Sequence, residues 1–245
     1  MTKTCTHLAG SNAVITGATG GIGGAIALAL ADSGVNLLLT GRDEGKLEEL
    51  AGRARRFGSE VQIWVAELEE DRGVAALAGR CHQSFDGIDL LVHSMGLFLG
   101  GALEQSSVQD LDRQYRVNVR SPFLLTQALL AGVKQRQGQI VFVNSSAGFS
   151  PARGGYGAYG ATKHALRAIA DSLRDEVQTS GVRVLTVFPG RTASAMQAEV
   201  HRYEDRPYDP AQWMQPEDVA HATLAALTLP RTAELTDLHV RPRGG

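Results

Sequence analysis

Several features of specialised protein classes are scarce or missing in this sequence. The 245 residues contain only two cysteines, Cys5 and Cys81, and these share neither a CxxC spacing nor a metal-ligand spacing. We therefore expect two reduced thiols and no metal site. The net charge of −2 provides no basic field for nucleic acid. No apolar run approaches the roughly 18 residues that span a bilayer, so we expect no membrane segment either.

The start of the chain and its overall composition indicate a single globular domain. Residues Met1–His7 contain no apolar region of the kind found in signal peptides, which favours a cytoplasmic protein. Hydrophobic residues make up 43% of the chain and charged residues 20%, which are ordinary globular values. A length of 245 residues suits one large domain over positions 1–245 better than two smaller ones.

Strand-like apolar runs alternate with helical patterns along the whole chain. The strand candidates are Ala13–Thr16, Asn36–Thr40, Val61–Val65, Leu90–His93, Ile140–Asn144, Val182–Phe188 and Leu238–Val240. Helical stretches between them include Gly45–Phe57, Gly73–Gln83, Val108–Leu130 and Ala158–Gln178. Most strand candidates lack polar alternation, as expected when helices cover both faces of a parallel sheet. The sequence thus predicts an α/β fold: a doubly wound, Rossmann-type parallel sheet of about seven strands with helices on both faces.

A glycine-rich turn follows the first strand candidate and precedes a helical run. It reads Thr16-Gly17-Ala18-Thr19-Gly20-Gly21-Ile22-Gly23, with the helix formers of Ala25–Ala31 after it. Strand, glycine turn and helix in this order are typical of a dinucleotide-binding loop, where backbone N–H groups and a helix N-terminus meet a pyrophosphate. The alternative is a flexible turn without a ligand. The predicted cofactor contacts in this loop are Gly17, Thr19, Gly21, Ile22 and Gly23.

Tyr159 and Lys163 form the candidate reactive pair. A spacing of four residues places both side chains on one face of a helix. An ammonium beside a phenol favours the phenolate, so we expect Lys163 to lower the pKa of Tyr159 from its ordinary value of about 10. A tyrosine tuned in this way could act as the acid/base for hydride chemistry on a carbonyl. Without the glycine loop the pair would be a weak signal, because this spacing recurs by chance in many helices.

Together, the two motifs make the chain resemble the short-chain dehydrogenase/reductase family in its compact single-domain form. The family patterns TGxxxGxG and YxxxK are met at Thr16, Gly17, Gly21, Gly23, Tyr159 and Lys163. Tyr156 is no rival to Tyr159, because Gly160 stands four residues after it. The resemblance covers essentially the whole sequence. It implies an oxidoreductase that interconverts a carbonyl and an alcohol on a small molecule, with Tyr159 as acid/base and Lys163 also holding the cofactor ribose.

The resemblance also implies a catalytic serine at the end of the fifth strand, in an SSxAG-like run. Anchoring on Ala147-Gly148 selects Ser145, whereas a spacing of thirteen residues back from Tyr159 selects Ser146. We expect Ser145, because the register at a strand end is more rigid than a glycine-rich loop. For either serine the alternative is a hydroxyl that satisfies backbone groups of a turn.

The resemblance also bears on three further places in the chain. Asn118 matches the family asparagine that disturbs a central helix and supports a proton relay to the lysine. Where the family often has NNAG, this chain has His93-Ser94-Met95-Gly96, in which Gly96 keeps the close backbone approach to the cofactor. We expect a structural role for His93, since an imidazole can also donate and accept hydrogen bonds. Glu67 replaces a common aspartate at the adenine edge, where the Leu68 backbone could still make contact.

The residue after the second strand candidate predicts the choice of cofactor. An acidic residue there grips the ribose of NAD, whereas a basic one receives the 2′-phosphate of NADP. Arg42 stands at this place, so we expect NADP(H) to be preferred. NAD(H) is possible if Arg42 is only solvated and Asp43 binds the ribose. After the sixth strand, the resemblance adds as cofactor contacts Pro189, Gly190 and Thr192, with Ser194 as an alternative to Thr192.

The segment Arg191–Gln215 is the one long stretch without clear periodicity. It begins at a strand's carboxyl end, where ligands bind in open α/β sheets. We expect it to be a substrate lid that is mobile without ligand. The alternative is a surface loop or part of a subunit contact.

Two other functions remain open at this point. One is a dinucleotide sensor or scaffold without turnover, and the other is a non-redox epimerase that uses bound NAD. A pure binder needs few of the residues Asn118, Tyr159 and Lys163, and epimerases of related fold usually carry a larger C-terminal region. The resemblance also implies a homodimer or homotetramer, paired through the helices at 108–130 and 158–178.

Overall fold

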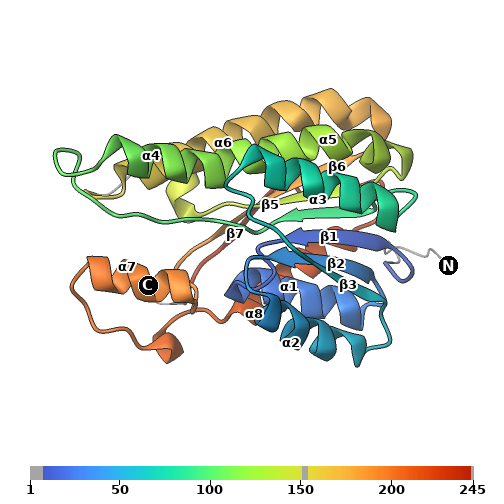
Figure 1. The fold of residues 1–245 in the computed structure, drawn as a ribbon, viewed down its shortest axis with the longest axis horizontal. Helices are drawn as coiled ribbons and strands as arrows, with labels where there is room; N and C mark the ends of the chain where they lie inside the picture. The colour runs from blue at the N-terminus through green and yellow to red at the C-terminus, as the bar shows by residue number, and fades with distance from the viewer. Residues whose placement is uncertain (1–7, 151–153, 244–245) are drawn as a thin grey trace.

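A single parallel sheet organises the chain (Figure 1). The computed structural model describes residues 8–150 and 154–243, so Cys5 and the rest of Met1–His7 lie outside the described residues. The seven strands lie in the order β3-β2-β1-β4-β5-β6-β7. They are β1 (Asn12–Thr16), β2 (Asn36–Gly41), β3 (Val61–Val65), β4 (Leu90–His93), β5 (Gln139–Val143), β6 (Arg183–Pro189) and β7 (Asp237–Val240). The predicted doubly wound α/β fold is confirmed.

Helices cover both faces of this sheet. They are α1 (Gly21–Asp32), α2 (Glu44–Arg55), α3 (Asp71–Ser84), α4 (Val108–Tyr115), α5 (Ser121–Gln135), α6 (Gly157–Val177), α7 (Ala195–Tyr203) and α8 (Pro216–Leu227). In Figure 1, α3, α5 and α6 lie above the sheet, and α1, α2 and α8 lie below it. The helix α7 stands apart, near the end of the sheet where the strands point.

Alternate residues of each strand face the two helical layers. On the inner strands, Val14 and Leu91 pack with α3, α5 and α6, whereas Ile15 and Val92 pack with α1, α2 and α8. All four side chains are fully buried. Because both faces are covered, both sets of residues must be apolar, and this explains why the strand candidates showed no polar alternation.

Two segments differ from their predicted secondary structure. The predicted helix Val108–Leu130 is broken by a π-helical turn at Arg116–Arg120 and then continues to Gln135. The segment Arg191–Gln215 is not a loop throughout, because it contains α7 and a short 3-10 turn. The helix α7 escaped notice because only Met196 and Val200, one turn apart, are its apolar inward residues. Ser194, which caps it by accepting from Gln197 N at 3.1 Å, was the available signal.

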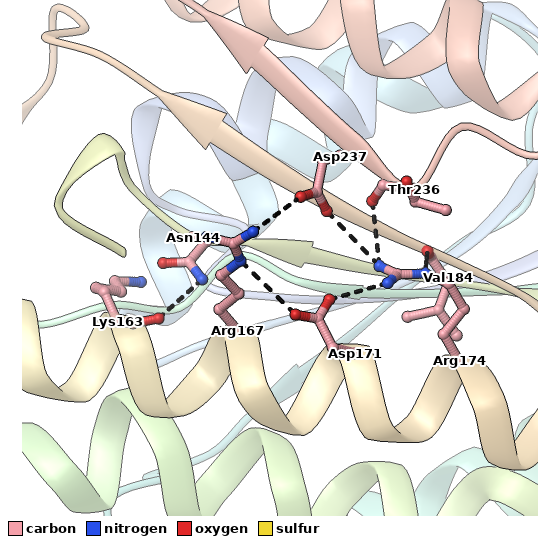
Figure 2. A network of polar contacts seen from close by, with 8 residues as sticks. All are labelled: Asn144, Lys163, Arg167, Asp171, Arg174, Val184, Thr236 and Asp237. Atoms are coloured by element: carbon pink, nitrogen blue, oxygen red, sulfur yellow. Dashed lines mark hydrogen bonds and ion pairs between the residues drawn. The ribbon is translucent and has the colours of Figure 1, made fainter. Parts of the chain in front are cut away.

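An ion-pair network fastens α6 to the edge strand β7 (Figure 2). Asp237 of β7 lies 3.6 Å from Arg167 and 3.7 Å from Arg174. Both arginines also pair with Asp171, at 3.6 and 2.9 Å, and Arg174 donates to the Thr236 carbonyl at 3.3 Å. Isolated exposed ion pairs contribute little, whereas a network that shares its partners contributes more. The network therefore helps to hold α6, which carries Tyr159 and Lys163, in register with the sheet.

Neither a membrane-spanning helix nor a cluster of metal ligands occurs within the described residues. Within 8–150 and 154–243, none of the helices combines the length and hydropathy that a bilayer span needs. In the same part of the chain, no three His, Cys, Asp or Glu side chains come together as metal ligands. Cys81 is a free thiol inside the core, where burial raises its pKa to about 12.

Candidate active site

The loops after β1 and β4 meet where the strand order reverses. The neighbours of β1 are β2 on one side and β4 on the other, so the chain crosses in opposite directions from this point. Gly17 follows β1 with φ of +65°, and a Cβ there would lie 2.7 Å from the backbone of Met95, which follows β4. A close approach in the left-handed region requires glycine. In open α/β sheets, ligands bind in the crevice at this switch point.

The N-terminus of α1 is left open toward this crevice. Its N-cap residue is Gly20, no side chain caps it, and no acidic residue lies in its first turn. By contrast, Asp43 and Ser194 cap α2 and α7. The backbone N–H groups of the first turn of α1 thus remain for an anion, as a dinucleotide pyrophosphate requires. A side chain at Gly23 would collide with the Gly17 carbonyl, so the turn fits closely against the helix.

The predicted cofactor residues near the end of β2 lie side by side. Thr19 packs over the strand end, with its Oγ1 3.0 Å from the position of a Cβ at Gly41. Arg42 comes next and is exposed. Asp43 is engaged in capping α2, where it accepts from Lys46 N at 3.1 Å. The Asp43 carboxylate is therefore already engaged at the start of α2.

The other predicted cofactor residues follow neighbouring strands. Leu68 is buried after β3, and the Glu67 side chain beside it is exposed. After β6, Gly190 N donates to the Val240 carbonyl at 2.8 Å, and the hydroxyl of buried Thr192 donates to the Gly190 carbonyl at 3.1 Å. These residues therefore all lie at the carboxyl edge of the sheet, with Pro189 as the last residue of β6.

Tyr159, Lys163 and Ser145 come together at the same edge. Tyr159 is 7% exposed and Lys163 is 2% exposed. The Lys163 Nζ lies 5.8 Å from the centroid of the Tyr159 ring and donates to the Val143 carbonyl at 3.3 Å. The Ser145 side chain hydrogen-bonds to Tyr159 and also accepts from Ala147 N at 3.2 Å. Of the two candidate serines, the structure brings Ser145 to the tyrosine.

Burial is the main cause of the pKa shifts of Tyr159 and Lys163. It raises the pKa of Tyr159 to about 12, and the hydrogen bond from Ser145 opposes this rise only in part. Burial also lowers the pKa of Lys163 to about 8. The predicted lowering of the Tyr159 pKa is therefore wrong in sign for this structure, because burial raises the pKa and the opposing contribution comes from Ser145. At neutral pH Tyr159 keeps its proton.

Asn118 lies at the centre of the π-helical turn. Its Oδ1 accepts from Leu97 N at 2.8 Å, and its Nδ2 donates to the Leu97 carbonyl at 2.9 Å and to Thr162 Oγ1 at 3.0 Å. The side chain thus joins this helix to the segment after β4 and to α6. A Cβ at Gly96 would lie 3.7 Å from Lys163 Nζ and 3.8 Å from Asn118 Oδ1, so all three positions border one space.

His93 is buried at the end of β4. Its Nε2 lies 2.8 Å from Thr126 Oγ1, and its ring stacks on Phe142 with centroids 5.0 Å apart. Burial lowers the pKa of His93 to about 3, so the ring is neutral at physiological pH. These contacts agree with the structural role that the sequence suggested.

Sequence reasoning missed the apolar cover over Tyr159. Phe98 and Val200 are buried against Tyr159, and Met196 packs beside them. The Phe98 ring meets the Tyr159 ring edge-on, with centroids 5.3 Å apart. Phe98 lies just beyond Gly96, at a strand's carboxyl end. An aromatic residue at this position could have indicated the apolar cover.

Comparison with known proteins gives the family. Residues 11–205 match the model of the short chain dehydrogenases. The chain belongs to the short-chain dehydrogenase/reductase family. This short-chain dehydrogenase/reductase is 35% identical over 237 residues to an uncharacterised short-chain type dehydrogenase/reductase of Sinorhizobium fredii, covering 95% of this chain and 91% of that protein.

Solved structures of other short-chain dehydrogenases/reductases share the fold. An alcohol dehydrogenase of Thermococcus sibiricus complexed with 5-hydroxy-NADP gives a TM-score of 0.86 at 27% identity, covering 95% of this chain and 96% of that chain. A short chain dehydrogenase of Burkholderia cenocepacia in complex with NADP also gives 0.86, at 26% identity, covering 96% and 98%. The family predicted from the two motifs is confirmed.

Replacing Lys163 by methionine should stabilise the folded protein at neutral pH. The pKa of Lys163 is about 8 in the folded state, against 10.5 for an ordinary lysine, so the unfolded state binds more protons between these values. The buried Lys163 ammonium thus lowers the free energy of unfolding by its full amount below pH 8. This loss disappears as the pH rises toward 10.5. At pH 7 we expect Lys163→Met to gain about 2–3 kcal/mol in free energy of unfolding.

Denaturant unfolding at pH 7 and pH 10 measures this gain. Lys134→Met, at a partly exposed position of α5, is the control and should show neither the gain nor its pH dependence. A Lys163→Met variant less stable than the wild type at pH 7 would contradict the account of the buried ammonium.

Proposed function

We propose that this protein is an NADP(H)-dependent oxidoreductase that interconverts a carbonyl and an alcohol on a small molecule. The observation that supports this most is the buried contact of Tyr159 with Ser145 and Lys163, at the switch point of the sheet and beside an uncapped helix N-terminus. A protein that only sensed or stored a dinucleotide would need the helix N-terminus but not the buried phenol, hydroxyl and amine.

In this proposal, each part of the cofactor would meet a different part of the chain. The glycine loop Gly17–Gly23 would hold the pyrophosphate, Arg42 the 2′-phosphate, and the Leu68 backbone with Glu67 the adenine edge. Gly96 and Lys163 would border the ribose on the nicotinamide side, as would the turn formed by Pro189, Gly190 and Thr192. When bound, the nicotinamide supplies or accepts the hydride. Both similar structures described above contain NADP or a derivative, which supports this choice.

Proton handling falls to four side chains of the protein. Tyr159 would give its proton to the carbonyl oxygen during reduction, or take one from the alcohol in reverse. Ser145 would donate to the developing alkoxide, a contribution that can reach about 3 kcal/mol. Lys163 would return a proton to Tyr159, and Asn118 would support this relay from the π-helical turn. A pKa of about 12 keeps Tyr159 protonated at neutral pH, which suits it to the reductive direction.

Removing the hydroxyl of Tyr159 tests this function. Tyr159→Phe keeps the ring that packs against Phe98, so folding and cofactor binding should persist. Turnover should fall by about 10²- to 10⁴-fold, the usual contribution of a general acid or base. The measurement is NADPH oxidation at 340 nm with a panel of carbonyls. Tyr115→Phe, at an exposed position of α4, is the control, and near-normal turnover of Tyr159→Phe would mean that the proton comes from elsewhere.

Arg42 should set the cofactor preference. Arg42→Asp places a carboxylate where the 2′-phosphate is proposed to lie, so the ratio of kcat/KM for NADPH over NADH should fall about tenfold or more. Arg53→Asp, an exposed change on the neighbouring helix α2, should leave the ratio unchanged. A wild-type preference for NADH, or a ratio that Arg42→Asp does not move, would refute the assignment.

We also propose that the chain forms a homodimer or homotetramer through α4 and α5. Val108, Leu111, Tyr115 and Phe123 are 66, 41, 50 and 46% exposed. The first three stand at i, i+3 and i+7 of α4, so they share one side of that helix. In a two-fold pairing, one such face meets its own copy.

Light scattering at micromolar concentration should therefore give a multiple of the 26.1 kDa chain mass. Leu111→Arg should shift the population toward the monomer, whereas Leu103→Arg, at a 94% exposed loop position, should not. A wild-type particle of single-chain mass would exclude this interface.

A further inference from the structure

The segment Arg191–Gln215 is anchored at both ends, and its helix α7 lies over the candidate active site. Thr192 and Met214 pair in a parallel bridge, and Ala193 N donates to the Met214 carbonyl at 2.8 Å. From this base, α7 places the methyl of Met196 3.4 Å from the position of a Cβ at Gly96. The segment thus has a fixed stem and one helix that covers Tyr159.

Glu204, just after the end of α7, bonds to two other parts of the chain. Its carboxylate accepts from the Arg191 guanidinium at 2.9 and 2.5 Å and from the Tyr156 hydroxyl at 2.6 Å. Glu204 is 14% exposed and Arg191 is 23% exposed, so the pair is largely shielded from water. Arg191 also lies over the Trp213 ring, 5.2 Å from its centroid. The Arg191 guanidinium holds the pKa of Glu204 at about 2, so the carboxylate stays ionised.

Tyr203, the last residue of α7, fits between two glycines. Gly155 has φ of +79°, and a side chain there would collide with the Tyr203 hydroxyl. A Cβ at Gly100 would lie 2.7 Å from the Tyr203 ring. Neither position could carry a side chain without displacing this ring. The Tyr203 ring therefore packs against two glycines from separate segments, which leave just enough space for it.

These contacts assemble aromatic rings around Phe98, which itself meets the Tyr159 ring. The centroid of Phe98 lies 5.1 Å from that of Tyr156, 5.3 Å from that of Tyr159 and 6.0 Å from that of Tyr203. Tyr156 precedes Tyr159 by three residues, at the N-cap of α6. Phe98, Tyr156 and Tyr203 are called the aromatic wall below.

The geometry points to Glu204 as a positioning residue that holds α7 over Tyr159 and holds the rings of the aromatic wall in place. The wall then favours neutral carbonyl substrates that carry a flat apolar group. This inference rests on the proposed function, because the wall borders the proposed proton donor. Glu204 acts through other residues: through Arg191 on the stem of the segment, and through Tyr156 on the start of α6.

The chemistry of the wall explains the substrate class. Aromatic faces and edges favour another ring at the 4.5–7 Å spacing that these residues already show among themselves. Arg191, which binds the same carboxylate as Tyr156 of the wall, is already neutralised by Glu204. A carboxylate substrate would therefore lose its hydration beside the wall without gaining that cation as a partner.

Glu204→Gln tests the fastening, because it removes the charge while keeping the shape of the side chain. Glu199→Gln is the matched control on the same helix, since Glu199 pairs with Arg202 on an exposed surface and is itself 55% exposed. Hydrogen exchange of the α7 amides in the full-length protein should accelerate about tenfold in Glu204→Gln, the loss of one strong hydrogen bond, and remain unchanged in Glu199→Gln. Equal exchange rates in the two variants would overturn the fastening role, and this readout does not depend on turnover.

Kinetics test the aromatic wall. The wild type should reduce acetophenone with NADPH at a kcat/KM about tenfold or more above those for acetone and pyruvate. Glu204→Gln should raise the KM for acetophenone about tenfold with kcat within about threefold, and leave the KM for NADPH unchanged. Tyr156→Phe, which keeps the ring but loses the bond to Glu204, should move the same KM in the same direction.

Three outcomes are distinguishable. Pyruvate reduced as well as acetophenone would overturn the substrate class. A fall in kcat with an unchanged KM in Glu204→Gln would overturn the positioning role. A wild type that reduces no carbonyl at all would instead refute the proposed function and, with it, the substrate class, while the exchange experiment would still decide whether Glu204 fastens α7.

Discussion

Burial of the Lys163 amine is the constraint on which the rest of the site depends. At 2% exposure it loses most of its hydration, and its pKa falls to about 8. Such a group persists only if the surrounding elements hold it in place. The Val143 carbonyl accepts from it, Asn144 holds the Lys163 backbone carbonyl through Nδ2 at 3.0 Å (Figure 2), and the ion pairs of α6 with β7 fix the helix. Burial of the Lys163 ammonium thus destabilises the fold at the place where the proposed chemistry needs an amine that can release its proton.

The same dryness governs Tyr159. The helix α7 and Phe98 cover the ring, so the phenol keeps its proton at neutral pH. Charge that develops beside it during reaction would be felt strongly, because the local dielectric is low and Ser145 is already aimed at the hydroxyl. The cover formed by α7 and Phe98 therefore links the packing of the site to the electrostatics of the proposed proton transfer.

The features that could be predicted from the sequence are those that a short local pattern encodes. The glycine loop, its flanking strand and helix, and the Tyr159–Lys163 spacing located the fold and the family, because each is encoded within a few adjacent residues. The resemblance implied that Asn118 disturbs its helix, but the π-helical form of this turn and the helix α7 were not predicted, since both depend on contacts with distant segments. Asn118 binds Leu97 and Thr162, and Val200 packs on Phe98. The sign of the Tyr159 pKa shift was wrong because helical spacing gives proximity but not burial.

The most direct test of the central claim is the fate of the transferred hydrogen. The protein would be incubated with a carbonyl substrate and NADPH that carries deuterium at the transferable position of C4, and the product alcohol analysed by mass spectrometry and NMR. The account predicts one deuterium on the carbinol carbon in the wild type and almost no product in Tyr159→Phe. Oxidised cofactor with an unlabelled carbinol carbon, or a product formed equally well by Tyr159→Phe, would contradict it.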